Sequence, residues 1–338
     1  MILVTGGTGL LGSHLLIDLL KKGKEIRVIS RIGEPSEFHF QLLEFYGLNP
    51  KLLDTSVEWV KGDVTDITSI EEAFKGVDLV YHCAAIVSFS PKLRKKMFEV
   101  NVNGTANVVN LTLANKIKRL CYISSTAAIG KKGNEELVVE DDEWHREMKS
   151  TNYSKSKFLA EREVWRGKEE GLEVVVINPC IVLGPGNWHL SSGIMFKNVN
   201  KGMKFYTSGS NGFVDVRDVI RVMQTLHEKN ITGERFLVIG ENLPFRTVFN
   251  YISDAFDKPR PFKFANKFLT GIGWRIEKIK SILTGKSPRL TKEMAQNAQI
   301  KIAYSNEKVK KAIGFEFTPI EETVKFSVDY CKKYMIKS

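Results

Sequence analysis

The sequence predicts an α/β fold in which a doubly wound parallel sheet is followed by a smaller C-terminal domain. Short runs rich in β-branched residues alternate with longer segments of helical period, the pattern of β-α-β units. A glycine-rich turn follows the first run, and a nearly continuous apolar run is typical of a strand buried on both faces. The seven expected strands are Ile2–Thr5, Ile26–Ser30, Val57–Lys61, Leu79–Ala84, Leu120–Ser124, Val174–Asn178 and Phe236–Ile239.

Helical period and turn residues divide the rest of the chain. Gly9 to Lys22 is expected to be a helix, because its leucines recur at spacings of three and four. After Asn178 turn residues become dense and the alternation becomes irregular. We therefore expect one domain over 1–178, a second over 179–338, and a return of residues 213–240 to the first.

Composition narrows the classes of protein that fit. No apolar run is long enough to span a bilayer and no signal-like region opens the chain, so we expect a cytoplasmic protein without an integral membrane segment. The charge of +11 is concentrated after Arg260, where 17 Lys and Arg face 7 Asp and Glu. We interpret this excess as a solvated face and expect no nucleic acid; a weak peripheral contact with an acidic membrane stays open. No metal site is expected, and we interpret the cysteines as reduced and structural: Cys83, Cys121, Cys180 and Cys331.

The glycine-rich turn is the first motif with a chemical meaning. It follows a strand and opens a helix, the context that a dinucleotide-binding turn requires. Glycines permit a tight turn and a close backbone approach, so that a pyrophosphate can bind the free N–H groups of the helix. The residues expected to contact the cofactor here are Gly6, Thr8, Gly9, Leu10, Leu11 and Gly12.

The end of the second strand bears on the choice of cofactor. An acidic side chain there would accept hydrogen bonds from an adenosine ribose, but the chain has Ser30 and Arg31. An arginine beside the ribose can pair with a 2′-phosphate. The two residues favour NADP, and NAD stays open.

A tyrosine and a lysine four residues apart form the second motif. Tyr153 and Lys157 stand at the start of an expected helix and share one face. An adjacent ammonium and a positively charged nicotinamide would stabilise the phenolate, so that the tyrosine could exchange a proton with a carbonyl compound. The spacing alone is common, and it gains meaning only with the other motifs.

Together the motifs resemble the extended short-chain dehydrogenases/reductases, also called the NAD-dependent epimerase/dehydratase family, over nearly the whole chain. The segments that carry the resemblance are Thr5–Gly12, Gly62–Val64, His82–Ala85, Asn101–Thr105, Ser124–Thr126, Tyr153–Lys157, Asn178–Pro179, Gly184–Gly186 and Phe213–Asp218. The resemblance implies an NAD(P)-binding Rossmann domain, a mainly substrate-binding second domain and a dimer as one compatible assembly.

The resemblance also implies roles for single residues. Ser125 would bond the reacting oxygen, Tyr153 would transfer the proton and Lys157 would hold the nicotinamide ribose. Ser124 would support the backbone, and packing or pyrophosphate-side roles are expected for His14 and His82. Further residues would line the cofactor, namely Asp63 and Val64 at the adenine, Ala84 and Ala85 in the channel, and Pro179, Ile181 and Val182 at the nicotinamide.

Departures from the family pattern narrow the reaction. Many sugar-nucleotide enzymes of the family carry an arginine where this chain has Ser210–Gly212, and the dehydratases need an Asp-Glu pair where it has Thr126 and Ala127. Arg31 and the segment Tyr304–Phe315 resemble the branch of dihydroflavonol reductases and 3β-hydroxysteroid dehydrogenases.

These departures favour a reductase or dehydrogenase that acts on a ketone or secondary alcohol of a small, hydrophobic substrate. Two alternatives stay open: an NAD-dependent nucleotide-sugar epimerase and a non-catalytic NAD(P)-sensing protein.

The segment from Phe264 to Leu283 is expected to be an amphipathic helix. Its apolar residues recur at spacings of four and three, with lysines and an arginine between them. Gly271 and Gly273 weaken this prediction. Packing on the second domain, a lid over a hydrophobic substrate and contact with an acidic membrane are the alternatives.

Overall fold

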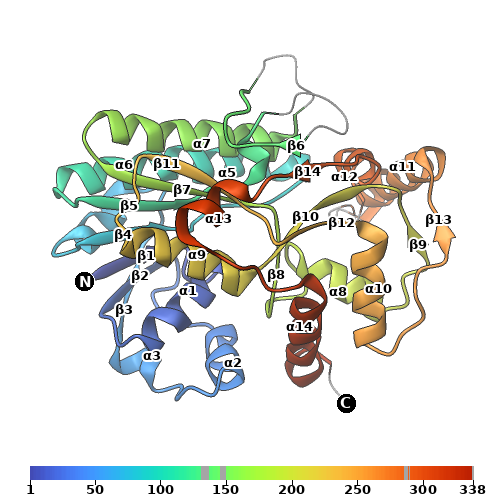
Figure 1. Cartoon of the computed structure of the whole chain (residues 1–338), viewed down its shortest axis with the longest axis horizontal. Helices are drawn as coiled ribbons and strands as arrows, with labels where there is room; N and C mark the ends of the chain where they lie inside the picture. The colour runs from blue at the N-terminus through green and yellow to red at the C-terminus, as the bar shows by residue number, and fades with distance from the viewer. Residues whose placement is uncertain (131–136, 145–149, 285–287, 289, 337–338) are drawn as a thin grey trace.

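The structure, a computed structural model, describes residues 1–130, 137–144, 150–284, 288 and 290–336. All seven predicted strands form one parallel sheet in the order β11-β7-β5-β4-β1-β2-β3 (Figure 1). Their bounds are β1 (Ile2–Thr5), β2 (Ile26–Ser30), β3 (Val57–Lys61), β4 (Leu79–His82), β5 (Arg119–Ile123), β7 (Glu173–Pro179) and β11 (Glu234–Val238). The predicted doubly wound parallel fold is confirmed.

Helices cover both faces of this sheet. The principal ones are α1 (Leu10–Lys21), α6 (Gly104–Ala114), α7 (Asn152–Glu169) and α9 (Val216–Glu228). Consecutive strand residues point to opposite faces, so Val4 packs in a core with leucines of α1 and apolar residues of α9. Leu3 packs in the other core with residues of α6 and α7. Burial on both faces explains why most residues of these strands are apolar.

A third core lies on the C-terminal side of the sheet. Its helices are α8 (Gly193–Asn200), α10 (Phe245–Ala255) and α14 (Ile320–Tyr334), and its three-stranded sheet has the order β12 (Glu241–Pro244), β10 (Ser210–Asp215), β8 (Ile181–Leu183). Within 213–240, Phe213 packs in this third core. The helix α9 packs on one face of the main sheet, and β11 is one of the strands of that sheet. The division of the chain at residue 178 stays a prediction.

The remaining elements are short or lie at the periphery. They are α2 (Glu37–Phe45), α3 (Leu52–Thr55), α4 (Ile67–Ile70), α5 (Arg94–Phe98), α11 (Lys267–Thr284), α12 (Lys292–Asn297), α13 (Glu307–Ile313), and the strand pairs β13 (Lys263–Phe264) with β9 (Phe205–Tyr206) and β14 (Ala303–Tyr304) with β6 (Leu137–Val138). Within the described parts of the chain, no helix is long and apolar enough to cross a membrane. The four cysteines are free thiols, as expected for reduced residues.

The predicted bounds of β5, β7, β11 and the first helix differ from the observed ones by one or two residues, and two further boundaries are wrong for a structural reason. The fourth strand ends at His82 instead of Ala84, because the backbone of Ala84 packs against the glycine turn. Phe264 does not belong to the amphipathic helix but pairs with Tyr206 in a short parallel ladder. The helix begins after Asn266, whose side-chain oxygen accepts a hydrogen bond from the N–H of Leu269 at 2.9 Å.

Candidate active site

The candidate site lies where the strand order reverses. β1 and β4 are neighbours, and the chain continues outward from them on opposite sides, so their carboxyl ends border the crevice typical of nucleotide sites. Gly6 has a φ of +70°, and a Cβ on it would lie 2.5 Å from the backbone nitrogen of Ala84. The backbone of Gly6 therefore packs against Ala84, one of the residues expected to line the cofactor channel, at the point where the strand order reverses.

The glycine turn leaves room for a ligand on its outer side. A Cβ on Gly12 would lie 2.2 Å from the carbonyl oxygen of Gly6, so the turn closes only with glycine at that position. Thr8 and Gly9 are exposed, and no side chain among the described residues caps the N-terminus of α1. The first N–H groups of a helix lack intrahelical partners, and a pyrophosphate fits them. The residues present thus fit a dinucleotide.

A histidine that sequence analysis missed supports the turn from below. The buried Nε2–H of His39 donates to the carbonyl of Gly7 at 3.0 Å, and its Nδ1 accepts from the N–H of Ser36 at 3.0 Å. The hydroxyl of Ser13 donates to the same carbonyl at 2.8 Å. Burial lowers the pKa of His39, which keeps the ring neutral. The sequence signal was a serine three residues before His39, a capping pattern at the start of α2.

The expected adenosine side of the site lies at the ends of β2 and β3. Arg31 is exposed, whereas the hydroxyl of Ser30 is buried and accepts a hydrogen bond from the N–H of Gly33 at 2.9 Å. Desolvation opposes ionisation of Asp63, but hydrogen bonds from Thr65 and the nearby charges of Arg31 and Lys96 hold its pKa below the usual value. Arg31 and Asp63 therefore face the same region. Val64 is buried and its carbonyl accepts from Asn107 at 2.9 Å.

Ser125 and Tyr153 meet beside the end of β5. The hydroxyl of Ser125 accepts from the N–H of Ala127 at 3.1 Å and is hydrogen-bonded to the phenol of Tyr153. Burial raises the pKa of Tyr153, and the bond to Ser125 opposes that rise. Phe89 packs edge-on against the tyrosine ring at a centroid distance of 6.2 Å. The structure therefore brings the predicted serine and tyrosine together in a partly apolar setting.

Lys157 lies one turn further along α7 and is only 1% exposed. Its Nζ donates to the hydroxyl of Tyr122 at 2.6 Å and to the carbonyl of Ile123 at 2.8 Å. Desolvation lowers its pKa to about 7, although Glu161 and Cys83 oppose the shift. The ammonium of Lys157 therefore donates to Tyr122 and Ile123. The lowering of the Tyr153 pKa by this ammonium together with a positively charged nicotinamide stays a prediction.

Glu161, also missed by sequence analysis, organises the polar residues behind the site. Its Oε2 accepts from the hydroxyl of Ser124 at 2.6 Å and from the amide of Asn178 at 2.8 Å. Its Oε1 accepts from Trp165 and Arg235, each at 3.2 Å. A buried carboxylate with four donors is well satisfied. The hydroxyl of Ser124, which was expected to support the backbone, thus donates to a side chain of α7.

Asn101 ties the loop after β4 to the helix of Tyr153. Its side chain exchanges two hydrogen bonds with the backbone of Ile86, at 2.7 and 3.0 Å, and donates a third to Ser156 at 3.0 Å. Asn101 belongs to a segment that carries the family resemblance, but the sequence alone predicted no role for it. A buried amide with three partners fixes the position of the loop that carries Ala84 and Ala85.

The two histidines singled out in the sequence are buried and hydrogen-bonded inside the fold. His82 bridges the hydroxyls of Thr5 at 2.6 Å and Thr105 at 2.9 Å. His14 bridges the hydroxyl of Tyr46 at 3.0 Å and the carbonyl of Pro185 at 2.8 Å. Burial lowers their pKa values to about 3 and about 4. Neutral, fully partnered rings agree with the expected packing roles.

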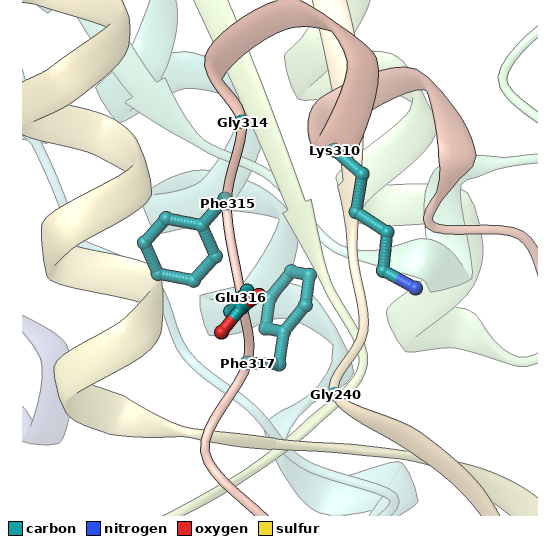
Figure 2. A pocket seen from close by; sticks show the side chains of 6 residues that line it. All are labelled: Gly240, Lys310, Gly314, Phe315, Glu316 and Phe317. Atoms are coloured by element: carbon teal, nitrogen blue, oxygen red, sulfur yellow. The ribbon is translucent and has the colours of Figure 1, made fainter.

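The expected nicotinamide side follows β7. Pro179 ends that strand and is buried, while Ile181 and Val182 are half-buried residues of β8. A separate surface hollow lies beyond β11 and contains none of the predicted site residues (Figure 2). Its lining residues are Gly240, Lys310, Gly314, Phe315, Glu316 and Phe317.

Comparison with known proteins agrees with this geometry. The model of the NAD dependent epimerase/dehydratase family matches residues 2–240. The chain belongs to this family. Sterol demethylase protein B of Methylococcus capsulatus is 30% identical over 77% of this chain and 75% of its own length. A putative dihydroflavonol 4-reductase of Synechocystis is 25% identical over 98% of this chain and 94% of its own.

Solved structures share the fold. The crystal structure of gox2253 superposes with a TM-score of 0.80 at 23% identity, and covers 99% of this chain and 98% of that one. The predicted resemblance to extended short-chain dehydrogenases/reductases is thus confirmed, and the chain is an NAD(P)-dependent oxidoreductase of that family.

Proposed function

We propose that the chain is an NADP-preferring reductase or dehydrogenase. Its reaction interconverts the ketone and the secondary-alcohol form of a small hydrophobic molecule. The observation that carries the proposal is the hydrogen-bonded pair of Ser125 and Tyr153 beside the switch point, with Lys157 one turn away. A non-catalytic sensor would have no use for this pair.

The cofactor would lie across the carboxyl ends of β1 to β4. The turn from Gly6 to Gly12 would bind its pyrophosphate, Asp63 and Val64 its adenine, and Ala84 and Ala85 would line its channel. Pro179, Ile181 and Val182 would border the nicotinamide, and Lys157 would hold the adjoining ribose. The exposed guanidinium of Arg31 supports a 2′-phosphate at the adenosine, and Ser30 would complete that corner.

A reduced nicotinamide supplies a hydride to a carbonyl carbon. The hydroxyl of Tyr153 would donate its proton to the carbonyl oxygen, and the hydroxyl of Ser125 would orient that oxygen by a hydrogen bond. Burial alone raises the pKa of Tyr153, so the phenolate that remains needs a nearby positive charge. The Lys157 ammonium, which donates to Tyr122 and Ile123, would supply it.

The surroundings of Tyr153 support an apolar substrate. Phe89 packs edge-on against the phenol ring. Ile129 stands where sugar-nucleotide enzymes often have a tyrosine and is buried in a core with Leu237 and Ile239. Asn211 stands near the position of their diphosphate-binding arginine, and its side-chain oxygen bonds the N–H of Gly212 at 2.8 Å. These features favour reduction over the alternative, nucleotide-sugar epimerisation with NAD.

Titration with NADPH and NADH tests the cofactor preference. The wild-type chain should bind NADPH more tightly, and Arg31→Asp should reverse the order, because the new carboxylate repels a 2′-phosphate and accepts hydrogen bonds from a ribose. Lys24→Asp is the matched control, since it makes the same charge change on an exposed lysine before β2, at the opposite edge of the sheet. Equal affinities for the two cofactors in the wild type would sink the assignment.

The catalytic assignment needs a substrate. A screen of ketones and sugar nucleotides for a change in nicotinamide absorbance would identify one, and Tyr153→Phe should then abolish turnover while NADPH binding is retained. Turnover by the phenylalanine variant would refute the proton-transfer role. Nicotinamide cofactor that stays bound through purification, with activity on a sugar nucleotide alone, would establish the epimerase instead.

A further inference from the structure

The helix α11 exposes its apolar side to solvent. Six of its apolar residues recur at helical spacing and lie on one face: Phe268, Ile272, Ile276, Ile279, Ile282 and Leu283. The side chains near its ends are the most exposed, with 73% for Phe268 and 79% for Leu283. Phe262 and Phe264, directly before the helix, are exposed as well. At the same spacing Arg275 falls within this stripe, where its guanidinium donates to the carbonyl of Gly271 at 2.8 Å and stacks over Trp274. An exposed and largely apolar surface of this kind marks an interaction site.

Cations border this apolar stripe. At 100° per residue, Lys267 and Lys278 lie on one side of it and Lys280 on the other. The surrounding sequence from Lys258 to Lys292 contains ten Lys and Arg and a single acidic residue, Glu277. An amphipathic helix with an apolar face and lysines along its flanks is the pattern of helices that lie in the headgroup region of a bilayer.

We propose that this α11 surface, the six apolar residues and the three bordering lysines, docks the protein on a bilayer that contains anionic phospholipids. A second copy of the chain fits less well, because a two-fold interface would place the same cations opposite one another. Protein interfaces are also depleted of lysine at their centres. The same cations are attracted to the negative surface of a membrane with anionic lipids.

The docked helix would place the candidate site near the membrane. Leu290, ahead of α12, packs against Gly273 of α11, and Glu293 of α12 accepts a hydrogen bond from the N–H of Asn152, the residue before Tyr153. A hydrophobic substrate could therefore pass from the lipid to the start of α7. This second step rests on the proposed function, whereas the docking itself does not.

Cosedimentation of the full chain with sucrose-loaded vesicles tests the docking. The wild type should bind vesicles of phosphatidylcholine with phosphatidylserine, bind pure phosphatidylcholine weakly, and release from the anionic vesicles at high salt. Each cation near an anionic surface strengthens binding about fivefold, so Lys278→Glu with Lys280→Glu should weaken it by at least about 25-fold. Ile279→Asp with Ile282→Asp should abolish it.

The matched control is Lys310→Glu with Lys311→Glu, which makes the same charge change on exposed lysines of α13. This control should keep most of the binding, and an equal loss there would show non-specific attraction and overturn the proposal. Failure of the wild type to bind anionic vesicles would overturn it as well. A dimer that dissociates on Ile279→Asp with Ile282→Asp would assign the surface to a second copy instead. NADPH titration of the same preparations separates the proposals, because docking without cofactor binding would contradict only the proposed function.

Discussion

Replacing the buried lysine of the site should stabilise the cofactor-free protein. Lys157 is 1% exposed, and desolvation lowers its pKa from 10.5 to about 7. Each unit of such a shift corresponds to about 1.4 kcal/mol. Burying the charged form of Lys157 therefore lowers the free energy of unfolding by about 5 kcal/mol at pH values up to about 7. Methionine has a similar length and no charge, and Lys157→Met removes this cost.

The variant also loses favourable contacts. Nζ of Lys157 donates to Tyr122 and to the carbonyl of Ile123, and each buried partner left unsatisfied costs roughly 1 to 2 kcal/mol. The net gain in the free energy of unfolding is therefore about 2 kcal/mol near pH 7. For a chain of this size, that gain raises the thermal midpoint by a few degrees, at about 2 °C per kcal/mol.

The pH dependence identifies the cause. Because the pKa of Lys157 is lower in the folded chain, the unfolded chain holds a proton that the folded chain lacks between about pH 7 and 10.5. The stability of the wild type therefore gains with rising pH in that window, and the variant lacks this gain. The advantage of Lys157→Met should shrink by about 1.4 kcal/mol per pH unit above pH 7 and reverse near about pH 8.5. By pH 10.5 the variant should be the less stable protein, because only the lost hydrogen bonds remain.

Thermal unfolding followed by circular dichroism at several pH values measures both effects. Lys155→Met, which changes an exposed lysine of the same helix, is the control and should leave the midpoint nearly unchanged. A Lys157→Met variant that is less stable than the wild type at pH 7, or a difference between them that does not change with pH, would refute the reasoning.

Other predictions concern the turn, the lysine and the buried histidines. Gly12→Ala should lower the thermal midpoint by several degrees, because its Cβ would lie 2.2 Å from the Gly6 carbonyl, whereas Gly9→Ala, with 3.4 Å to the same atom, should keep the midpoint and weaken only NADPH binding. Tyr122→Phe removes one hydrogen-bond acceptor of Lys157, so NADPH affinity should fall and its dependence on pH should shift to lower pH. As the pH falls from 6.5 to 4, His14 should lower the free energy of unfolding by up to about 3 kcal/mol. The reason is that its pKa is about 4 in the folded chain, so that in this range the unfolded chain binds a proton that the folded chain does not. His14→Gln should therefore unfold less steeply with acid in a urea titration, and exposed His189→Gln should not.

The sheet and the glycine turn could be predicted because their signals are local. The strands β1 and β2 are short runs rich in β-branched residues, and their predicted bounds agree with the structure residue for residue. Gly6 directly follows β1 and Gly12 lies in the first turn of α1, so the turn could be recognised from the spacing of its glycines. Boundaries that depend on tertiary contacts were less accurate, as at Ala84, where packing against Gly6 ends the strand.

The supporting residues of the site could not be predicted for the same physical reason. His39, Asn101 and Glu161 are polar residues within helices or helical turns, and such residues are usually exposed. Their burial depends on partners far away in the chain, such as Gly7 for His39 and Asn178 for Glu161. The exposed stripe of α11 shows the converse, since its periodicity predicted a helix but not whether a partner would cover it.

The helix α7 shows where a rule based on apolar periodicity fails and why that failure is informative. Its buried residues are Ser156, Lys157, Ala160, Glu161, Val164 and Gly167, so the spacing of a core-facing helix is present while three of the six positions are polar or charged. A charged side chain is buried only when partners compensate for its lost hydration, and Tyr122 and Ser124 supply such partners from the end of β5. A stripe of this composition destabilises a plain scaffold, and it persists where charged groups are needed at a fixed place. Lys157 and Glu161 are four residues apart on the buried face of α7, and both are charged. This combination indicates that α7 contributes to the candidate site, independently of the glycine turn.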